Sequence, residues 1–333
     1  MILQRVYNNI LQFYRQGEQP GTMGRVASKL FRLATKNAGA SVVYSVDGIL
    51  LGVPPSHGTP FLWCVNKDYS KSLGRIAAAC SRKYPNSVLI DIGANIGDSA
   101  AIIRSQGVKN TIISVEGVQK FFDILQSNIP QLGNTIPVKA FIGTSHSHTY
   151  VKIRVTDAGN AHIYEDAEDY GTEKTGLDTR AEFITITDLA KRYASDDEVK
   201  LIKTDIECYD IPVLNGSLDF ISRHLPVIFL ELHIRDIDEK VKGVSWKDMW
   251  SNLKRLGYSK ALYWYNSCDF LCMLDLDTDE SVIDDIHGYL RNRAGLIYAD
   301  VCLIHKNDDD LADAAYKLEK QHAIDLRSAF GEA

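Results

Sequence analysis

The sequence predicts an α/β fold in which a mostly parallel sheet is covered by helices on both faces and follows an extension of different character. From residue 87 onward, short runs rich in Val, Ile and Leu alternate with stretches of helical periodicity. Such near-continuous apolar runs are typical of parallel strands, which are buried on both faces. The 333 residues, 45% of them hydrophobic, are enough to bury a sizeable core.

The first 84 residues form the predicted N-terminal extension. Apolar residues recur at helical spacing near the N-terminus, and the Asp47-Gly48 pair between two apolar runs indicates a β-hairpin. The elements expected here are helices over 1–16 and 25–36, a hairpin over 41–54 and a helix over 70–84. We therefore expect a helical and hairpin extension over 1–84 ahead of the sheet domain.

The sheet domain is expected over residues 85–306, and residues 307–333 are expected to form a C-terminal helix. Strands are predicted at 87–93, 110–116, 138–143, 199–205, 226–233, 260–265, 269–274 and 298–306, and helices at 97–106, 119–129 and 245–256. The last two strands resemble a closing hairpin with a helical insertion between them.

A long segment, residues 144–182, separates the third predicted strand from the fourth. It begins with a β-like run over 148–156 and continues as polar, acidic chain. A polar insertion of this length inside a compact domain is usually functional or flexible. The segment is therefore interpreted as a substrate lid or a flexible loop.

The cysteines and the apolar runs indicate the compartment. The six cysteines contain no Cys-x-x-Cys pair and no recognisable zinc or disulfide framework. Free thiols are typical of the reducing cytoplasm, which is the expected location. The N-terminal segment lacks the apolar core and cleavage site of a signal peptide, and no apolar run approaches the roughly 20 residues that span a bilayer.

The charge is spread unevenly along the chain. A net charge of −6 argues against nucleic acid as the partner. Residues 1–40 hold six Lys or Arg and one acid, which makes them +5 and leaves −11 for the rest of the chain. Two interpretations of the basic helices within 1–36 stay open. They would contact an anionic membrane surface or a glycan-assembly partner, or they would form a helical cap or the dimerisation arm of a homo-oligomer.

The strongest chemical signal is the segment DIGANIGD (91–98), at the point where a buried strand turns into a helix. Gly93 and Gly97 allow the backbone to approach a ligand at the carboxyl end of the sheet. The spacing is neither a dinucleotide fingerprint nor a P-loop. Glu116 ends the next strand, where an acid accepts hydrogen bonds from ribose hydroxyls. Acids around a glycine turn suit a cationic nucleoside such as S-adenosylmethionine (SAM).

This segment and three further blocks resemble the FkbM family of methyltransferases. The blocks are DIGANIGDSA (91–100), ISVE (113–116), IKTDIECYDIPVLNGS (202–217) and LPVIFLELH (225–233), and the resemblance spans about residues 85–305. It implies the class I methyltransferase (Rossmann-like) fold, with a seven-stranded, mostly parallel sheet whose last strand is antiparallel. It also implies SAM as the methyl donor and a hydroxyl oxygen as the acceptor.

The resemblance also assigns residues to the donor. Gly93 and Asn95 would line the methionine part, Glu116 would hold the ribose, and Ile142 and Gly143 would lie near the adenine. Asp205, at the end of the fourth predicted strand, would lie between donor and acceptor. The full predicted donor set is Asp91, Gly93, Ala94, Asn95, Gly97, Asp98, Ser99, Glu116, Gly117, Ile142, Gly143 and Asp205.

Three positions depart from the usual pattern of the family. Gly117 stands where the family usually has Pro after the acid of the second strand. In the Lys-x-Asp-x-Glu block, Cys208 stands where Gly is usual and Asp210 where Glu is usual. The first departure concerns the loop near the ribose, and the other two concern the acceptor side.

Groups that could move a proton are expected where the fourth and fifth strands end. Methyl transfer from a sulfonium to a hydroxyl needs oriented reactants and removal of the hydroxyl proton. The predicted catalytic set is Lys203, Asp205, Glu207, Glu231 and His233. His233 or Asp205 is the expected base, and Lys203 would orient an acid or the acceptor oxygen. Asp205, Glu231 and His233 would also suit a divalent metal, so metal-dependent and metal-free chemistry both stay open.

The function expected from these motifs is O-methylation of a saccharide hydroxyl in a surface glycan or polysaccharide. Two alternatives stay open. One is methylation of a nonsugar natural product, such as a polyketide or a peptide. The other is a SAM-binding scaffold protein without catalytic activity, which the departures at Cys208 and Asp210 keep open.

Overall fold

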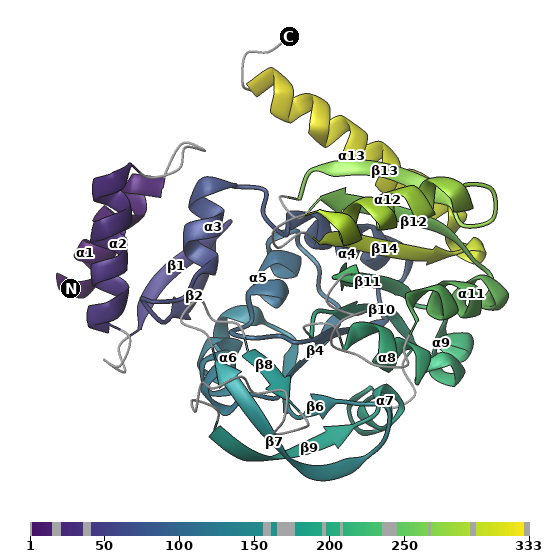
Figure 1. Cartoon of the computed structure of the whole chain (residues 1–333), viewed down its shortest axis with the longest axis horizontal. Helices are drawn as coiled ribbons and strands as arrows, with labels where there is room; N and C mark the ends of the chain where they lie inside the picture. Colours follow the sequence, from purple (N-terminus) through teal and green to yellow (C-terminus); the bar gives the residue numbers. More distant parts are fainter. Residues whose placement is uncertain are drawn as a thin grey trace.

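The computed structural model describes residues 2–14, 21–35, 41–155, 161–164, 177–194, 198–206, 209–234, 245–265, 268–293 and 298–329 (Figure 1). These residues form a hairpin, a large sheet and a smaller sheet, with helices between and around them. In Figure 1 the N-terminal elements lie at the left of the large sheet, and the smaller sheet lies below it.

The large sheet has eight strands in the order β13-β12-β14-β11-β10-β3-β4-β5. Their bounds are β3 (Val88–Ile92), β4 (Thr111–Glu116), β5 (Thr135–Lys139), β10 (Val199–Thr204), β11 (Val227–Leu232), β12 (Tyr258–Tyr265), β13 (Phe270–Asp275) and β14 (Ala299–His305). The five strands from β5 to β11 are parallel, and β14 lies antiparallel between β11 and β12. The expected class I arrangement of seven strands is therefore present, and β13 adds an eighth strand at the edge.

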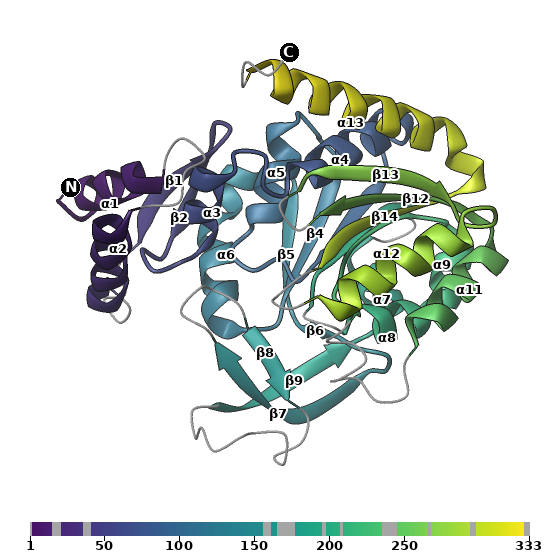
Figure 2. The same ribbon diagram turned by 45° about the horizontal axis from the view of Figure 1, so that its top comes forward.

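Alternate residues of the central strands pack on opposite faces of this sheet. Leu89 packs with the helices of one face, whereas Val88 and Ile90 pack with those of the other. The first face carries α4 (Lys71–Lys83), α5 (Asp98–Ser105), α6 (Gln119–Leu132) and α13 (Asp309–Ala329). The opposite face carries α7 (Ile186–Tyr193), α8 (Asp210–Asn215), α9 (Leu218–His224), α11 (Trp246–Leu256) and α12 (Glu280–Asn292) (Figure 2). Burial on both faces explains why β3 is apolar except for Asp91 and why all residues of β10 are buried, Lys200 and Lys203 among them.

The N-terminal elements are α1 (Ile2–Leu11), η1 (Gln12–Tyr14), α2 (Thr22–Thr35), β1 (Val42–Val46), β2 (Ile49–Val53) and α3 (Thr59–Val65). The predicted hairpin is confirmed, because β1 pairs antiparallel with β2 around Asp47 and Gly48, which both have positive φ. Asn128 on α6 fastens this hairpin to the sheet domain. Its side chain accepts from the Gly52 amide (2.8 Å) and donates to the Gly52 and Ile96 carbonyls (3.0 and 2.9 Å).

The third predicted strand, residues 138–143, is divided between two sheets. Residues up to Lys139 belong to β5, at the edge of the large sheet, where Pro137 does not interrupt a central ladder. After Ala140 the chain enters the smaller sheet, which has the order β6-β9-β7-β8. Its strands are β6 (Phe141–Ile142), β7 (Ser147–Val155), β8 (Ala161–Tyr164) and β9 (Leu177–Ile184). Much of the 144–182 insertion is thus β-structure.

The chain ends with η3 (Lys306–Asp308) and α13, which lies along α4. Glu319 on α13 pairs with Arg75 on α4 at 2.6 Å and accepts a hydrogen bond from the Trp264 indole at 2.9 Å. A terminal helix was expected in this region. Among the helices that the structure describes, none is long and apolar enough to cross a membrane.

Candidate functional site

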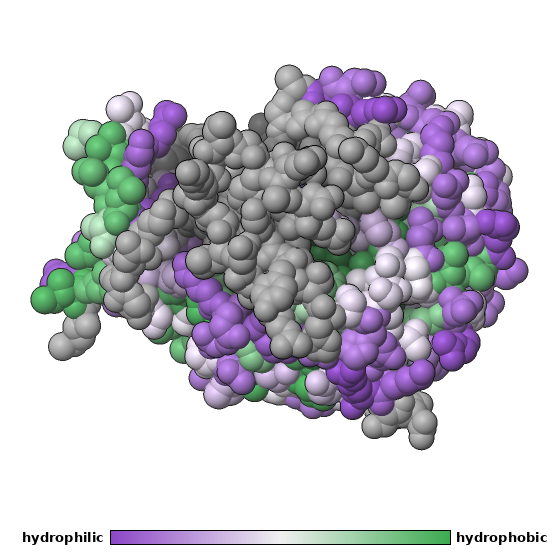
Figure 3. Space-filling view, turned by 60° about the horizontal axis from the view of Figure 1, so that its bottom comes forward, coloured by the Kyte–Doolittle hydropathy of each residue, from purple (hydrophilic) through white to green (hydrophobic). Residues whose placement is uncertain are grey.

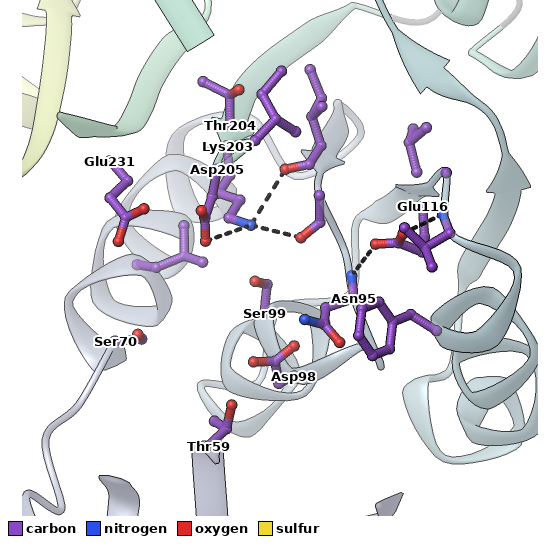
Figure 4. A pocket seen from close by; sticks show the side chains of 18 of the residues that line it. Thr59, Ser70, Asn95, Asp98, Ser99, Glu116, Lys203, Thr204, Asp205 and Glu231 are labelled. Carbon is purple, nitrogen blue, oxygen red and sulfur yellow. Dashed lines mark hydrogen bonds and ion pairs between the residues drawn. The ribbon is translucent and has the colours of Figure 1, made fainter. Parts of the chain in front are cut away.

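A cavity of about 640 Å³ opens at the carboxyl ends of β3, β4, β10 and β11. Its size falls within the range of small-molecule sites. Of the predicted residues, those that line it are Gly93, Asn95, Asp98, Ser99, Glu116, Gly117, Ile142, Lys203, Asp205, Glu231 and His233. In Figure 4, Asn95 and Glu116 lie at one end, Asp205 and Glu231 at the other, and Lys203 between them.

Four other predicted donor residues lie outside the cavity wall and support it from behind. They are Asp91, Ala94, Gly97 and Gly143. Asp91 and Ala94 are buried. Gly97 has φ of 91°, and a Cβ there would come within 2.8 Å of Leu132. These residues shape the loop but do not face the space in which a ligand would lie.

The loop after β3 needs its first glycine for two reasons. Gly93 has φ of 76°, and a Cβ on it would lie 2.1 Å from the backbone oxygen of Asp205. Asn95 also has positive φ, 48°, a conformation that Asn tolerates better than most residues. The loop after β3 therefore lies directly against the backbone at the end of β10. Asn95, in the same loop, lines the cavity.

Glu116 fixes this loop from the end of β4. One carboxylate oxygen accepts from the Asn95 amide at 2.9 Å, and the other accepts from the Val118 amide at 2.6 Å. A carboxylate has about four acceptor positions, so two remain for hydroxyl groups of a ligand. Burial raises the pKa of Glu116 to about 7, in spite of these two hydrogen bonds.

Lys203 is the cation at the centre of the site. Its buried Nζ lies 3.4 Å from an Asp91 oxygen and 3.6 Å from an Asp205 oxygen, and it donates to the Gly93 carbonyl at 3.1 Å. Burial alone would lower the pKa of Lys203, but Asp91 and Asp205 keep it above its ordinary value. The same burial raises the pKa of Asp91. Lys203 thus links the loop after β3 to Asp205.

At the other end, side chains from separate elements converge. His233 Nε2 lies 2.9 Å from a Glu231 oxygen, and the His233 ring packs against Tyr298 with centroids 4.7 Å apart. The Tyr298 hydroxyl in turn lies 3.4 Å from the Tyr69 hydroxyl. The predicted convergence of the fourth and fifth strand ends is therefore present, and two tyrosines join it.

Asp300 is a cavity residue that the sequence reasoning missed. It lies on β14 directly opposite Glu231 of β11 in the strand register. Burial raises the pKa of Asp300 to about 7, and the nearby Asp205 adds to this, while Lys203 opposes it. The sequence feature that could have identified it is a lone acid in the apolar run YADVCLIHK (298–306). Only the antiparallel pairing of β14 with β11 brings this acid to the site.

The methyltransferase profile decides the family. The Methyltransferase FkbM domain profile matches residues 91–260, which is more than half of the chain. The chain belongs to the FkbM methyltransferase family. The resemblance seen in the sequence is thereby confirmed, and so are the class I, Rossmann-like fold and its association with SAM-dependent methyl transfer.

Several solved structures are similar to this FkbM-family chain. One is a methyltransferase FkbM from Methylobacillus flagellatus KT, with 19% identity and a TM-score of 0.32 over 46% of this chain and 35% of that one. Another is a TehB-like SAM-dependent methyltransferase from Corynebacterium glutamicum (10%, TM-score 0.33, 70% and 88% covered). A third is Aeropyrum pernix fibrillarin in complex with S-adenosyl-L-methionine (12%, TM-score 0.33, 66% of each chain covered). This chain thus spans about a third of the M. flagellatus protein. No curated protein matches its sequence.

Two departures from the usual FkbM pattern have structural counterparts. The Phe141 ring lies over Gly117, where a Cβ would come within 2.2 Å of it, so the space beside this position is filled by an aromatic ring. Phe141 stacks on Phe183 of β9 with centroids 5.4 Å apart.

The second departure, Asp210, is buried and accepts from the Thr204 hydroxyl (2.6 Å) and the Ile206 amide (3.2 Å). Burial raises the pKa of Asp210 to about 6. It holds the chain after β10 and does not line the cavity. Glu207 and Cys208 lie outside the described residues.

The described side chains do not form a metal site in this FkbM-family protein. Over the residues that the structure describes, no group of three or more His, Cys, Asp or Glu side chains is arranged to hold an ion. Asp205, Glu231 and His233, the predicted metal option, share the cavity wall without such an arrangement.

The N-terminal extension contributes to the cavity as well. Arg32 of α2 and a run from Gly58 to Leu62 line it, although Pro60 does not. Behind this run, the buried His57 has its Nε2 3.4 Å from the Asn95 side-chain oxygen. Burial lowers the pKa of His57 to about 4, so it is neutral at pH 7. No pattern in the sequence connected His57 to the loop after β3.

Proposed function

We propose that this FkbM-family protein is a SAM-dependent O-methyltransferase that acts on a saccharide hydroxyl. One observation carries the proposal. A single cavity joins a glycine loop fixed by a strand-end acid to a histidine–carboxylate pair at its other end. The first arrangement suits a cationic nucleoside, and the second suits removal of a proton from a hydroxyl.

The residues of the loop end fit the donor. When bound, SAM supplies a methyl group on a positively charged sulfur, which is already a good leaving group. Asp98 and Glu116 line this part of the cavity and would favour the positive charge. Glu116 would accept from the ribose with the positions that its two backbone hydrogen bonds leave open. The loop from Gly93 to Asn95 would lie against the methionine part.

His233 is the proposed base. If its Nε2–H donates to Glu231, the imidazole keeps its basic lone pair on Nδ1, and Nδ1 would take the hydroxyl proton. Glu231 would then stabilise the charged imidazolium. Asp205 is less suited, because a proton on it would weaken its 3.6 Å ion pair with the buried Lys203. Lys203 is therefore a positioning residue that holds Asp205 and the donor loop in place.

The lining of the acceptor end supports a sugar. Tyr69, Ser70 and Tyr298 bring hydroxyl groups and Asp300 and Glu231 bring carboxylates, and groups of these kinds form hydrogen bonds with sugar hydroxyls. The tyrosine rings also offer apolar faces. A cytoplasmic location, where SAM is made, is part of the proposal. It agrees with the cysteines that the structure describes, none of which forms a disulfide bond: Cys64, Cys80, Cys268, Cys272 and Cys302.

The test is release of S-adenosylhomocysteine in the presence of a panel of sugar and nonsugar acceptors. Loss of the base should lower the turnover of His233→Ala by about 10²- to 10⁴-fold, with donor affinity by calorimetry unchanged. His146→Ala, at an exposed histidine outside the cavity, is the matched control and should keep full activity. Full activity of His233→Ala would remove His233 from the mechanism. Donor binding without turnover on any acceptor would favour a scaffold protein, and turnover on nonsugar acceptors alone would replace the saccharide.

A further inference from the structure

Helix α2 leaves an apolar stripe uncovered. It packs on the rest of the protein through Gly24 and Ser28, which are buried, and through Phe31, whose ring lies 6.1 Å from that of Tyr7 on α1. Four other apolar side chains of α2 point outward: Met23 is 84% exposed, Val26 52%, Leu30 62% and Leu33 57%. Their spacing of three and four residues places them on one side of the helix.

Helix α1, which contacts α2, extends this surface. Ile2 and Val6 on α1 are exposed, and so is Phe13 just after it. In Figure 3 apolar colouring gathers over the N-terminal elements at the left of the molecule. We call the exposed apolar residues Ile2, Val6, Phe13, Met23, Val26, Leu30 and Leu33 the N-terminal apolar surface.

Basic side chains accompany the N-terminal apolar surface. Arg5 and Lys29 are exposed on the two helices, and neither helix contains an acidic residue. The charge of residues 1–40 is +5 against −11 for the remainder of the chain. The basic N-terminal part of an acidic protein thus also carries two of its most exposed apolar side chains, Met23 at 84% and Ile2 at 83%.

We propose that α1 and α2 dock the protein on an anionic lipid surface. A helix with one apolar side and Lys or Arg beside it lies in the plane of a membrane interface, with its apolar side chains among the lipid chains and its cations at the headgroups. None of the described helices crosses a bilayer, so this contact is peripheral. The inference does not depend on the proposed reaction.

Charge complementarity favours lipid over a second copy of the chain as the occupant. A two-fold dimer through this surface would face the same patch on both subunits. Arg5 and Lys29 would then meet their own copies, and no acid on α1 or α2 would balance them. Anionic headgroups supply the opposite charge, and acyl chains accept Leu30 and Leu33.

The test is co-sedimentation of the full chain with vesicles at low salt. The probes are phosphatidylcholine vesicles with and without about one third phosphatidylserine. We expect binding to the anionic vesicles, at least tenfold weaker binding to neutral ones, and release at high salt. Leu30→Ser with Leu33→Ser, and separately Arg5→Glu with Lys29→Glu, should each weaken anionic binding at least tenfold.

Leu318→Ser on α13 is the matched control, because Leu318 is 41% exposed and far along the chain from this surface. It should bind the anionic vesicles as the wild type does. Thermal melting and SAM binding of every variant should be unchanged, because the substituted side chains are exposed and outside the cavity. No sedimentation with anionic vesicles at low salt would overturn the proposal. A wild-type dimer that Leu30→Ser with Leu33→Ser splits, without vesicle binding, would also overturn it and assign the surface to a second copy.

Discussion

The two ends of the cavity are built in different ways. The end where we propose that the methyl donor binds, called the donor end, is shaped mostly by backbone. Gly93 and Asn95 adopt positive φ there, and Glu116 accepts two backbone amide hydrogen bonds. The end where we propose that the acceptor binds, called the acceptor end, is formed by side chains from several separate elements, such as Glu231 on β11 and Asp300 on β14. A backbone site is defined by a short stretch of sequence and tolerates little change, whereas a side-chain site depends on how the sheet is assembled.

The largest expected effect breaks the donor end through its backbone. Gly93→Ala should lower SAM affinity by at least 100-fold, because the new Cβ would lie 2.1 Å from the Asp205 backbone oxygen. The measurement is calorimetry with SAM and with S-adenosylhomocysteine, accompanied by thermal melting.

Gly107→Ala separates this clash from backbone strain. Gly107 has a similar φ, 79°, but nothing lies within 4 Å of a Cβ there. The left-handed conformation costs a non-glycine residue roughly 1–2 kcal/mol. This control should therefore lose some stability and keep its SAM affinity. Equal losses of affinity in both variants would mean that strain, and not the close contact of Gly93 with Asp205, governs the donor end.

The contrast also explains what the sequence could predict. Four of the five parallel strands, the hairpin at Asp47-Gly48 and the glycine loop after β3 are local patterns, and each is present where it was expected. Glu116 was predicted to lie by the loop because it follows the second parallel strand, whose end is adjacent to that of the first. These features need only periodicity, turn chemistry and the neighbouring order of successive strands.

The remaining features depend on contacts between distant segments. Asp300 reaches the cavity because β14 inserts antiparallel beside β11, which no local pattern announces. Arg32 reaches it, and His57 contacts Asn95 behind the cavity wall, because the N-terminal extension packs against α6 and the loop after β3. The division of residues 138–143 between two sheets likewise depends on β9, about 40 residues later in the chain, which pairs with β6.

The second prediction concerns the role of Asp300 at the acceptor end. Asp300→Asn should lower kcat/KM by about 10- to 100-fold while the affinity for SAM stays within twofold, because Asp300 lies with Glu231 and not with the donor loop. Steady-state kinetics with the best acceptor and calorimetry with SAM measure the two. Asp219→Asn, at an exposed acid on α9, is the control and should match the wild type. A drop in SAM affinity equal to the drop in kcat/KM would make Asp300 part of the donor end.

The third prediction concerns the pH dependence of donor binding. The pKa of Glu116 in the free protein is about 7, so the carboxyl takes up a proton as the pH falls below 7. A protonated carboxyl is a poorer acceptor for ribose hydroxyls and does not attract the sulfonium. SAM affinity should therefore fall by about tenfold or more between pH 7.5 and 5.5. Glu116→Gln should bind SAM more weakly at pH 7.5 and lose most of this pH dependence. A wild-type affinity that is constant over this range would exclude Glu116 as a ribose acceptor.

The smallest expected effect is on folding, at the contact of His57 with Asn95. The pKa of His57 is lowered by burial from 6.5 to about 4, so between these values the unfolded chain binds more protons than the folded one. The contribution of His57 to the free energy of unfolding is therefore complete above pH 6.5. It falls by about 1 kcal/mol between pH 7.5 and 5.5. Glu116 acts in the opposite direction, because its raised pKa makes the folded chain bind more protons between pH 4.5 and 7.

The pH-dependent contributions of His57 and Glu116 to the free energy of unfolding thus nearly cancel in the wild type. Single variants separate the two contributions. His57→Gln keeps a polar group beside Asn95 without a titration, so its unfolding free energy by urea denaturation should fall less, or rise more, on acidification than that of the wild type. Glu116→Gln should show the reverse. The other buried acids are the same in all three proteins. Their contributions therefore drop out when the unfolding free energy of each variant is compared with that of the wild type. If His57→Gln followed the wild-type pH dependence, His57 would not be held neutral behind the donor loop, and the N-terminal extension would support Asn95 through packing alone.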